Sequence, residues 1–209
     1  MSLRSGRGSK KADNNNGRAF TGRVGVSPRL GTEFGVSVHT GDYDADGERR
    51  LTIAALDAMA ARGPFEILGE AALATAGVAG AGDAEGALAP TTVTGREDAE
   101  AALATTTMAG RENAEAAGFY LEGRVHFLSG AISALPLSVF TGTVRADYVD
   151  HDRNTDGSDR QRLTVGVNFR PTEQTVFKND VLFDRNRGAG ASDWSDTETA
   201  YRFSIASYF

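Results

Sequence analysis

The sequence predicts an all-β chain whose antiparallel strands run up and down, as the strands of a transmembrane β-barrel do. Apolar and polar residues alternate with period two from residue 17 onward, which is the pattern of half-buried strands. Most of these segments are about 8 to 11 residues long, close to the roughly 9 to 11 residues that cross a bilayer at a tilt. Short and long connections alternate, as expected for tight turns at one rim and longer loops at the other.

Nine segments carry this pattern. In the clearest, 118–128, one face is apolar and the other carries charges of both signs: Phe119, Leu121, Gly123, Val125 and Phe127 alternate with Tyr120, Glu122, Arg124 and His126. The segment 50–61 is apolar at both parities, so its facing stays open and a short helix is an alternative. The nine segments are 19–26, 33–41, 50–61, 65–73, 118–128, 140–148, 162–170, 175–184 and 201–209.

The connections define the expected organisation. Residues 1–16 are polar and read as a tail or the remnant of an external loop, and residues 17–209 form the barrel segment. A long external loop is expected at about 76–117; its Ala-, Gly- and Thr-rich sequence favours disorder, with a short helix folded into the lumen as the alternative. Prolines, which cannot donate to a β-ladder, gather in the short connections, at Pro28, Pro64, Pro136 and Pro171.

Aromatic residues are sorted to the two ends of the segments. If the short turns are periplasmic, one group lies near that rim: Phe34, Phe65, Phe127, Phe140, Phe169, Phe177 and Phe209. The other group lies near the external rim: Phe20, Phe119, Tyr148, Phe183, Tyr201 and Phe203. Two aromatic girdles around an aliphatic band are the expected lipid-facing surface of a membrane barrel.

Composition excludes several classes of protein. The chain has 209 residues and a net charge of −6, with no basic cluster beyond its first dozen residues, so a nucleic-acid partner is not expected. It contains no cysteine, which removes disulfides and cysteine metal sites. No run of 18 or more apolar residues is present, so no transmembrane helix is expected. A soluble all-β module remains as an alternative.

Charged residues at alternate positions are the candidate functional feature, because rings of charge set the selectivity of pores. The alternative is an ordinary polar lining whose charges pair across strands. The mixture of signs gives no ladder of cations that would indicate anion selectivity. The candidate pore-lining residues are Arg23, His39, Glu66, Glu70, Glu122, Arg124, His126, Arg145, Asp147, Arg162, Lys178, Asp180 and Arg202.

No motif indicates catalysis or a cofactor. Two loops read D-x-[DN]-x-D-G, at residues 42–47 and 152–157, which is how a calcium-binding loop begins. The glutamate required at the twelfth position is replaced by Ile53 and Leu163, so these loops read as Asp/Asn/Gly turns rather than as metal sites. The three histidines have no nucleophile at a recognisable spacing, so neither catalytic residues nor an enzyme are expected.

Several segments together resemble the C-terminal part of the porin family typified by the phosphate-selective porins O and P. These are NNNGRAFTGRVGVSP, LGTEFGVSVHTGDYDADGE, GPFEILGE, GFYLEGRVHFL, RADYVDHDR and RLTVGVNFRPTEQTVFKND, and the resemblance covers roughly residues 14–209. The most specific part is 166–178, in which two strands flank an R-P-T-E turn. Asn179 departs from the family pattern, because it stands at a lipid-facing position that is usually apolar.

The resemblance implies an integral barrel of the bacterial outer membrane, of roughly 16 strands, through which small polar or anionic solutes diffuse passively. It also implies contact with outer-membrane lipid, assembly as a homotrimer, and recognition of the C-terminal strand by the outer-membrane assembly machinery. A structural or adhesive barrel that transports nothing is the alternative. Nine strands are an odd number and residues 1–17 lack the apolar stretch of a signal peptide, so the chain is expected to be the C-terminal portion of a longer barrel, unless one strand was missed.

Overall fold

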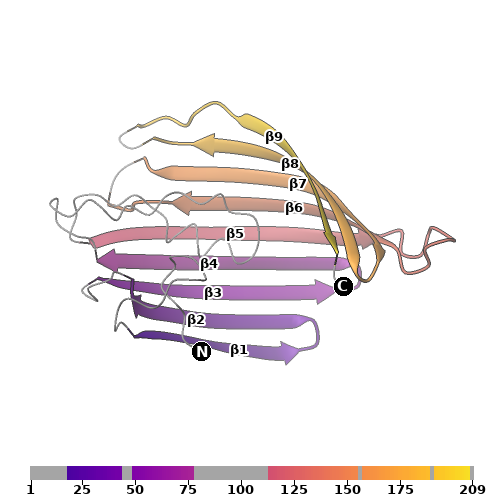
Figure 1. Ribbon diagram of the computed structural model, residues 1–209, viewed down its shortest axis with the longest axis horizontal. Helices are drawn as coiled ribbons and strands as arrows, with labels where there is room; N and C mark the ends of the chain where they lie inside the picture. The colour runs from indigo at the N-terminus through magenta and orange to yellow at the C-terminus, as the bar shows by residue number, and fades with distance from the viewer. Residues whose placement is uncertain (1–17, 44–48, 78–112, 155–156, 189–190, 208–209) are drawn as a thin grey trace, which may run out of the picture.

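The computed structural model describes residues 18–43, 49–77, 113–154, 157–188 and 191–207. These residues form one antiparallel sheet of nine strands, in which each strand pairs with its neighbours in the sequence (Figure 1). The strands are β1 (Ala19–Arg29), β2 (Thr32–Asp42), β3 (Arg50–Arg62), β4 (Phe65–Gly77), β5 (Asn113–Phe127), β6 (Val139–Asp150), β7 (Asp159–Thr172), β8 (Thr175–Asn186) and β9 (Glu198–Ser207). The predicted all-β, up-and-down order is confirmed.

The ambiguous segment 50–61 is a strand and not a helix. It pairs with β2 over residues 50–60 and with β4 over residues 51–62. Its exposure alternates, with Ile53 and Ala55 buried on one face while Leu56 is 60% exposed on the other. Backbone hydrogen bonds to two neighbouring strands therefore decide the structure of a segment whose local sequence is compatible with both a helix and a strand.

Tight turns join strands at one end of the sheet, as the sequence predicts, but the connection from β5 to β6 at the same end is long and spans residues 128–138. The turns β1–β2 and β3–β4 are tight, and each contains a glycine in the left-handed region, Gly31 and Gly63. We call the edge of the sheet that carries these turns the turn end and the opposite edge the loop end.

The strands that flank the loop predicted at about 76–117 extend into this range, because β4 runs to Gly77 and β5 starts at Asn113, and these two residues pair. The alternation of small residues near Ala74 and Ala116 was too weak to mark these strand ends in the sequence. The segment 78–112, the tail 1–16 and residues 208–209 lie outside the described residues.

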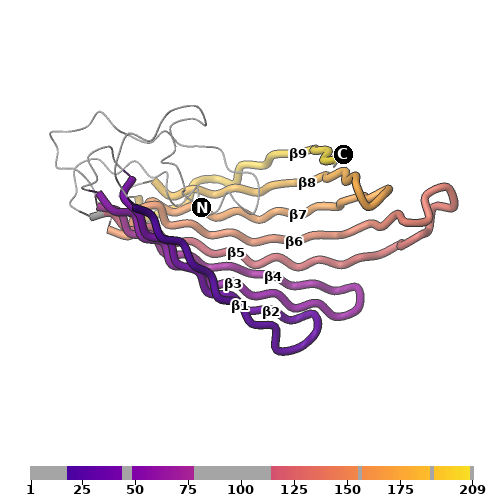
Figure 2. The backbone as a smooth tube through the Cα atoms, turned by 60° about the horizontal axis from the view of Figure 1, so that its bottom comes forward, coloured from indigo at the N-terminus to yellow at the C-terminus, as the bar shows by residue number. Residues whose placement is uncertain are grey.

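The sheet is curved into an open trough and is not closed into a barrel. Figure 2 shows β1 and β9 along the two rims of this trough. Strand β1 pairs with β2 and β9 pairs with β8, and no described strand covers the other edge of either. Two rows of backbone hydrogen-bonding groups are therefore left without a strand partner among the described residues.

The two faces of the sheet have opposite polarity, and the apolar one is exposed. On the convex outer face, Val24 is 72% exposed, Leu121 58% and Phe203 52%. On the concave inner face, charged and polar side chains are sheltered; Glu122 and Thr141 are both 9% exposed. A water-soluble sheet would bury its apolar face, so this polarity is reversed relative to a soluble domain.

Aromatic rings on the outer face form a continuous row near the turn end. Phe127, Phe140, Phe169 and Phe177 come from four successive strands, with ring centroids 6.0, 4.5 and 6.2 Å apart along the row. Near the loop end, the rings of Phe119 and Tyr148 are 5.5 Å apart. Aromatic residues that stand near the ends of separate strands in the sequence are thus brought into contact when the strands pair.

The anomalous Asn179 does lie on the outer face, but it has a partner. The ladder between β8 and β9 runs through Asn179 without a register shift. The hydroxyl of Tyr201, from β9, donates to Asn179 Oδ1 at 2.8 Å. A cross-strand hydrogen bond therefore satisfies the amide oxygen, so neither a slip of register nor a position at the rim is needed to accommodate it.

Candidate functional site

Register places the charges of several strands side by side on the inner face. Because side chains alternate across each strand, residues opposite one another in the ladder point to the same side. Glu122 is opposite Arg145, Glu66 is opposite Arg124, and Asp180 is opposite Arg202. Each of these pairs has opposite charges, which favours this register over its one-residue alternatives.

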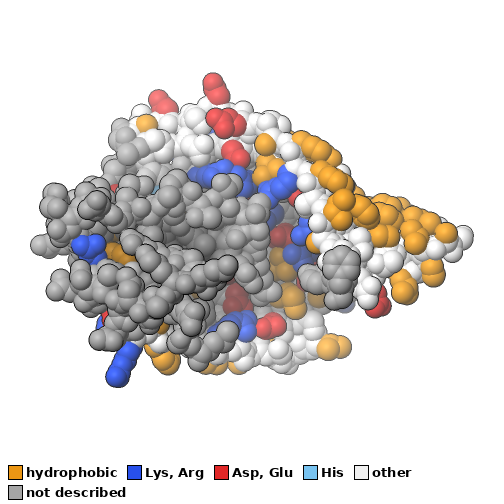
Figure 3. Space-filling view, viewed as in Figure 1, with side chains coloured by type: hydrophobic (Ala, Val, Ile, Leu, Met, Phe, Trp, Pro, Cys, Tyr) orange, Lys and Arg blue, Asp and Glu red, His pale blue; other side chains and the backbone are white. Residues whose placement is uncertain are grey.

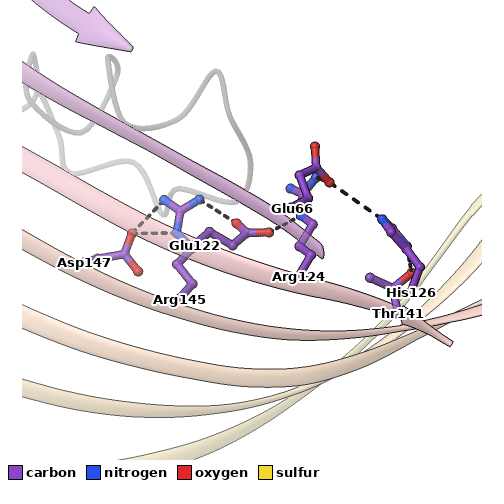
Figure 4. A network of polar contacts seen from close by, with 7 residues as sticks. All are labelled: Glu66, Glu122, Arg124, His126, Thr141, Arg145 and Asp147. Carbon is purple, nitrogen blue, oxygen red and sulfur yellow. Dashed lines mark hydrogen bonds and ion pairs between the residues drawn. The ribbon is translucent and has the colours of Figure 1, made fainter. Parts of the chain in front are cut away.

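Arg145 is the centre of the largest ion-pair network (Figure 4). Its Nη2 lies 2.6 Å from Asp147 Oδ1 and its Nη1 lies 3.6 Å from Glu122 Oε2. The guanidinium carbon also lies 3.8 Å from the ring centroid of Tyr120, a cation–π contact. One arginine thus binds two carboxylates and an aromatic ring in the middle of the inner face.

The same network continues toward the turn end. Arg124 Nη1 lies 3.3 Å from Glu66 Oε2, and Arg124 also binds Glu122. His126 approaches Glu66 at 3.8 Å and is hydrogen-bonded through Nδ1 to Thr141 Oγ1 at 2.8 Å. Figure 4 shows these side chains projecting from β4, β5 and β6 into one continuous chain of contacts.

A second network joins β1, β2 and β3. Arg23 Nη2 lies 2.9 Å from Glu33 Oε1 and 2.7 Å from Asp57 Oδ2. Gly35 lies between them, and a side chain at this position would meet the Asp57 carboxylate. Asp57 was missing from the predicted lining because its strand is apolar at both parities, so the sequence did not show its facing.

A third network lies on β7 and β8. Arg162 Nε is 2.7 Å from Asp184 Oδ1, and Arg160 Nη2 is 3.3 Å from the same oxygen. Asp184 is only 8% exposed, so its two arginines replace the water that it has lost. Neither Arg160 nor Asp184 was among the predicted lining residues, although both follow the inward parity of their strands.

The remaining predicted residues are not drawn into one site. His39 bonds with the Thr21 hydroxyl through Nδ1 at 2.8 Å. Glu70 lies opposite Asp57 on β3 and Tyr120 on β5 in the ladders. Among the residues that the structure describes, Lys178 and Arg202 have neither an ion pair nor a hydrogen bond, although both flank Asp180.

The inner face is not polar throughout, which the sequence did not predict. Near the loop end, Ile53, Ala74 and Ala116 lie opposite one another on β3, β4 and β5, with exposures of 8, 2 and 0%. Leu51, Ala72 and Val149 pack against them. On β3 to β5 the charged networks therefore occupy the middle and the turn end of the trough, whereas Arg160 and Asp184 on β7 and β8 lie near the loop end.

Outside the strands, the loop between β6 and β7 is held by its own side chains. The backbone N–H of Asp152 donates to Asp150 Oδ1 at 3.1 Å and is 2.8 Å from Ser158 Oγ. Burial lowers the pKa of His151, and the nearby Arg160 lowers it further. Within the described ranges, no group of three metal-ligating side chains converges here or elsewhere; Asp44, Asp46, Gly47 and Asp156 lie outside those ranges.

The described residues include no helix that is long and apolar enough to cross a membrane.

No protein-family profile and no curated protein matches the chain.

Proposed function

We propose that the chain forms part of the wall of a porin-like β-barrel in the bacterial outer membrane, and that small polar solutes diffuse along its inner face. The observation that carries the proposal is the reversed polarity of the sheet. Its exposed face is apolar and its sheltered face holds networks of charge. A lipid-facing outside and a water-filled inside require this arrangement, whereas a soluble sheet requires the opposite.

Strand length supports the same proposal. The strands have 10 to 15 residues, and a strand rises about 3.3 Å per residue. At a tilt of about 45°, roughly 10 residues cross the hydrocarbon layer. The aromatic row from Phe127 to Phe177 fits one girdle of such a band.

The two edge strands of the sheet, β1 and β9, need further strand partners if the sheet lies in a membrane. Each unpaired backbone group in hydrocarbon costs several kcal/mol, so an exposed sheet edge is not tolerated there. In the membrane, β1 and β9 are therefore expected to pair with strands beyond those described, as in a larger barrel of the kind that the sequence resembles. Such a barrel would contact outer-membrane lipid and would be inserted by the assembly machinery through β9; a homotrimer of barrels is the expected assembly.

Single-channel recording in a planar lipid bilayer tests this function. The purified protein, refolded from detergent as the complete barrel in which β1 and β9 are both paired, should give discrete conductance steps in a simple salt solution. Insertion without conductance would contradict the channel and favour the alternative, a structural or adhesive barrel. A monomer that stays soluble without detergent would contradict both, because the apolar outer face would then have to be compatible with water.

A further inference from the structure

The charges of the inner face are segregated by strand. On β1 to β6, six carboxylates face inward with three arginines, and on β7 to β9, five cations face inward with three carboxylates. The first set is Glu33, Asp57, Glu66, Glu70, Glu122 and Asp147 with Arg23, Arg124 and Arg145. The second is Arg160, Arg162, Arg170, Lys178 and Arg202 with Asp180, Asp184 and Glu198. Carboxylates are thus in excess on one part of the wall and cations on the other.

Pairing sharpens this segregation. Each arginine of the first set binds two carboxylates, as Arg23 does with Glu33 and Asp57, so no guanidinium there is left for a solute. In the second set, Arg160 and Arg162 share Asp184. Lys178, which is exposed, and Arg202 have no ion pair or hydrogen bond in the described part of the chain, and together these two cations outnumber the one carboxylate beside them, Asp180, with which both interact electrostatically.

Curvature sets the two parts of the wall against each other. The early strands form one side of the curved sheet and β8 and β9 the other (Figure 2). Figure 3 shows Lys, Arg, Asp and Glu side chains gathered in the trough. Opposite charge on facing walls with a low-dielectric backing creates an electric field across the passage.

We propose that the passage favours solutes that carry both an ammonium and a carboxylate group, such as free amino acids. This inference rests on the proposed channel function. Such a solute can turn its ammonium toward the carboxylate-rich strands and its carboxylate toward Lys178 and Arg202. A neutral solute of the same size has a smaller dipole and gains less from the field, and a singly charged ion is attracted to one wall but repelled by the other.

Swelling of proteoliposomes tests the proposal with two isomers, glycine and glycolamide, which share one formula but only the first of which is zwitterionic. The complete barrel, with β1 and β9 paired and reconstituted in phosphatidylcholine vesicles, should pass glycine about threefold faster, the gain expected from a weak pair of solvated ionic contacts. The double variant Lys178→Gln/Arg202→Gln should bring the two rates together. Arg185→Gln is the matched control, because it removes a cation from the outward parity of β8.

The possible failures are distinguishable. Equal rates for the two isomers in the unaltered chain, or a glycine preference that survives in the double variant, would overturn the zwitterion proposal and leave the channel intact. No swelling with either isomer would remove the channel and the proposal with it. If the double variant does not fold, Lys178→Gln alone replaces it, since this side chain is exposed, and it should lower the preference in the same direction.

Discussion

At the scale of single residues, polar groups on both faces are held by partners on neighbouring strands. Arg145 has a carboxylate on its own strand, another on β5 and an aromatic ring beside it. Asn179, on the opposite face, has only the Tyr201 hydroxyl. Under the proposed function the difference matters for stability, because an unpaired group would cost more on the lipid-facing side than on the water-filled side.

The pair Asn179 and Tyr201 gives the first prediction. Tyr201→Phe removes the hydroxyl and leaves the amide oxygen of Asn179 unpaired, so the free energy of unfolding should fall by about 1 to 3 kcal/mol. Asn179→Leu removes the amide itself and should be neutral or stabilising. Urea unfolding of each variant in lipid vesicles measures this; no loss in Tyr201→Phe, or a larger loss in Asn179→Leu than in Tyr201→Phe, would contradict the unpaired amide as the cause.

His151 gives a prediction for pH dependence. Its lowered pKa means that the folded loop favours the neutral imidazole, while the unfolded chain takes up a proton near its ordinary pKa of about 6.5. The stability contributed by the neutral form is therefore present above about pH 6.5 and is lost as the pH falls toward the lowered folded pKa. Besides Arg160, Asp150 and Asp159 also act on this imidazole, and both oppose the shift.

The measurement is urea unfolding in vesicles at pH 8 and at pH 5.5. The unaltered chain should lose more stability between these values than His151→Gln, whose side chain does not titrate. Carboxylates that titrate at lower pH are the same in both proteins, so they cancel in the comparison. A larger loss in His151→Gln than in the unaltered chain would contradict the direction of the shift.

At the scale of elements, the alternation of apolar and polar residues predicted most of the strands and which face most side chains occupy. It did not predict these where apolar residues stand at both parities. Segment 118–128 showed its two faces clearly, and β5 places them so. Segment 50–61 hid its facing, because alanine and leucine occur at both parities, and the ion pair of Asp57 with Arg23 was missed with it. The partner of Asn179 also could not be predicted, because it depends on the register between β8 and β9.

The tight turns give a prediction at this scale. Gly31 and Gly63 both have positive φ, 77° and 59°, but only Gly31 is crowded: a Cβ there would lie 2.5 Å from the carbonyl oxygen of Ala61. Gly63→Ala meets nothing within 4 Å and should cost about 1 kcal/mol from conformation alone. Gly31→Ala should cost clearly more, because backbone must move. Unfolding of both variants under the same conditions decides it; equal costs would contradict the role of the Ala61 contact.

At the scale of the whole molecule, the account depends on which face meets lipid. The trough has an exposed apolar outside, which is unfavourable for a monomer in water, and a charged inside. Its two open edges fit a wall within a membrane only when further strands pair with them. The charge networks of the inner face were foreseeable as inward-facing charges. Their segregation between early and late strands became visible only when register and pairing were known.

The most direct test places a fluorescent probe on each face in turn. The chain has no cysteine, so Val144→Cys on the outer face and Thr143→Cys on the inner face can each carry a single label. In vesicles, lipid brominated on its acyl chains should quench the probe at 144 and spare that at 143, while aqueous iodide should do the opposite. Equal quenching at both positions, or stronger lipid quenching at 143, would contradict the assignment of the apolar outer face to lipid.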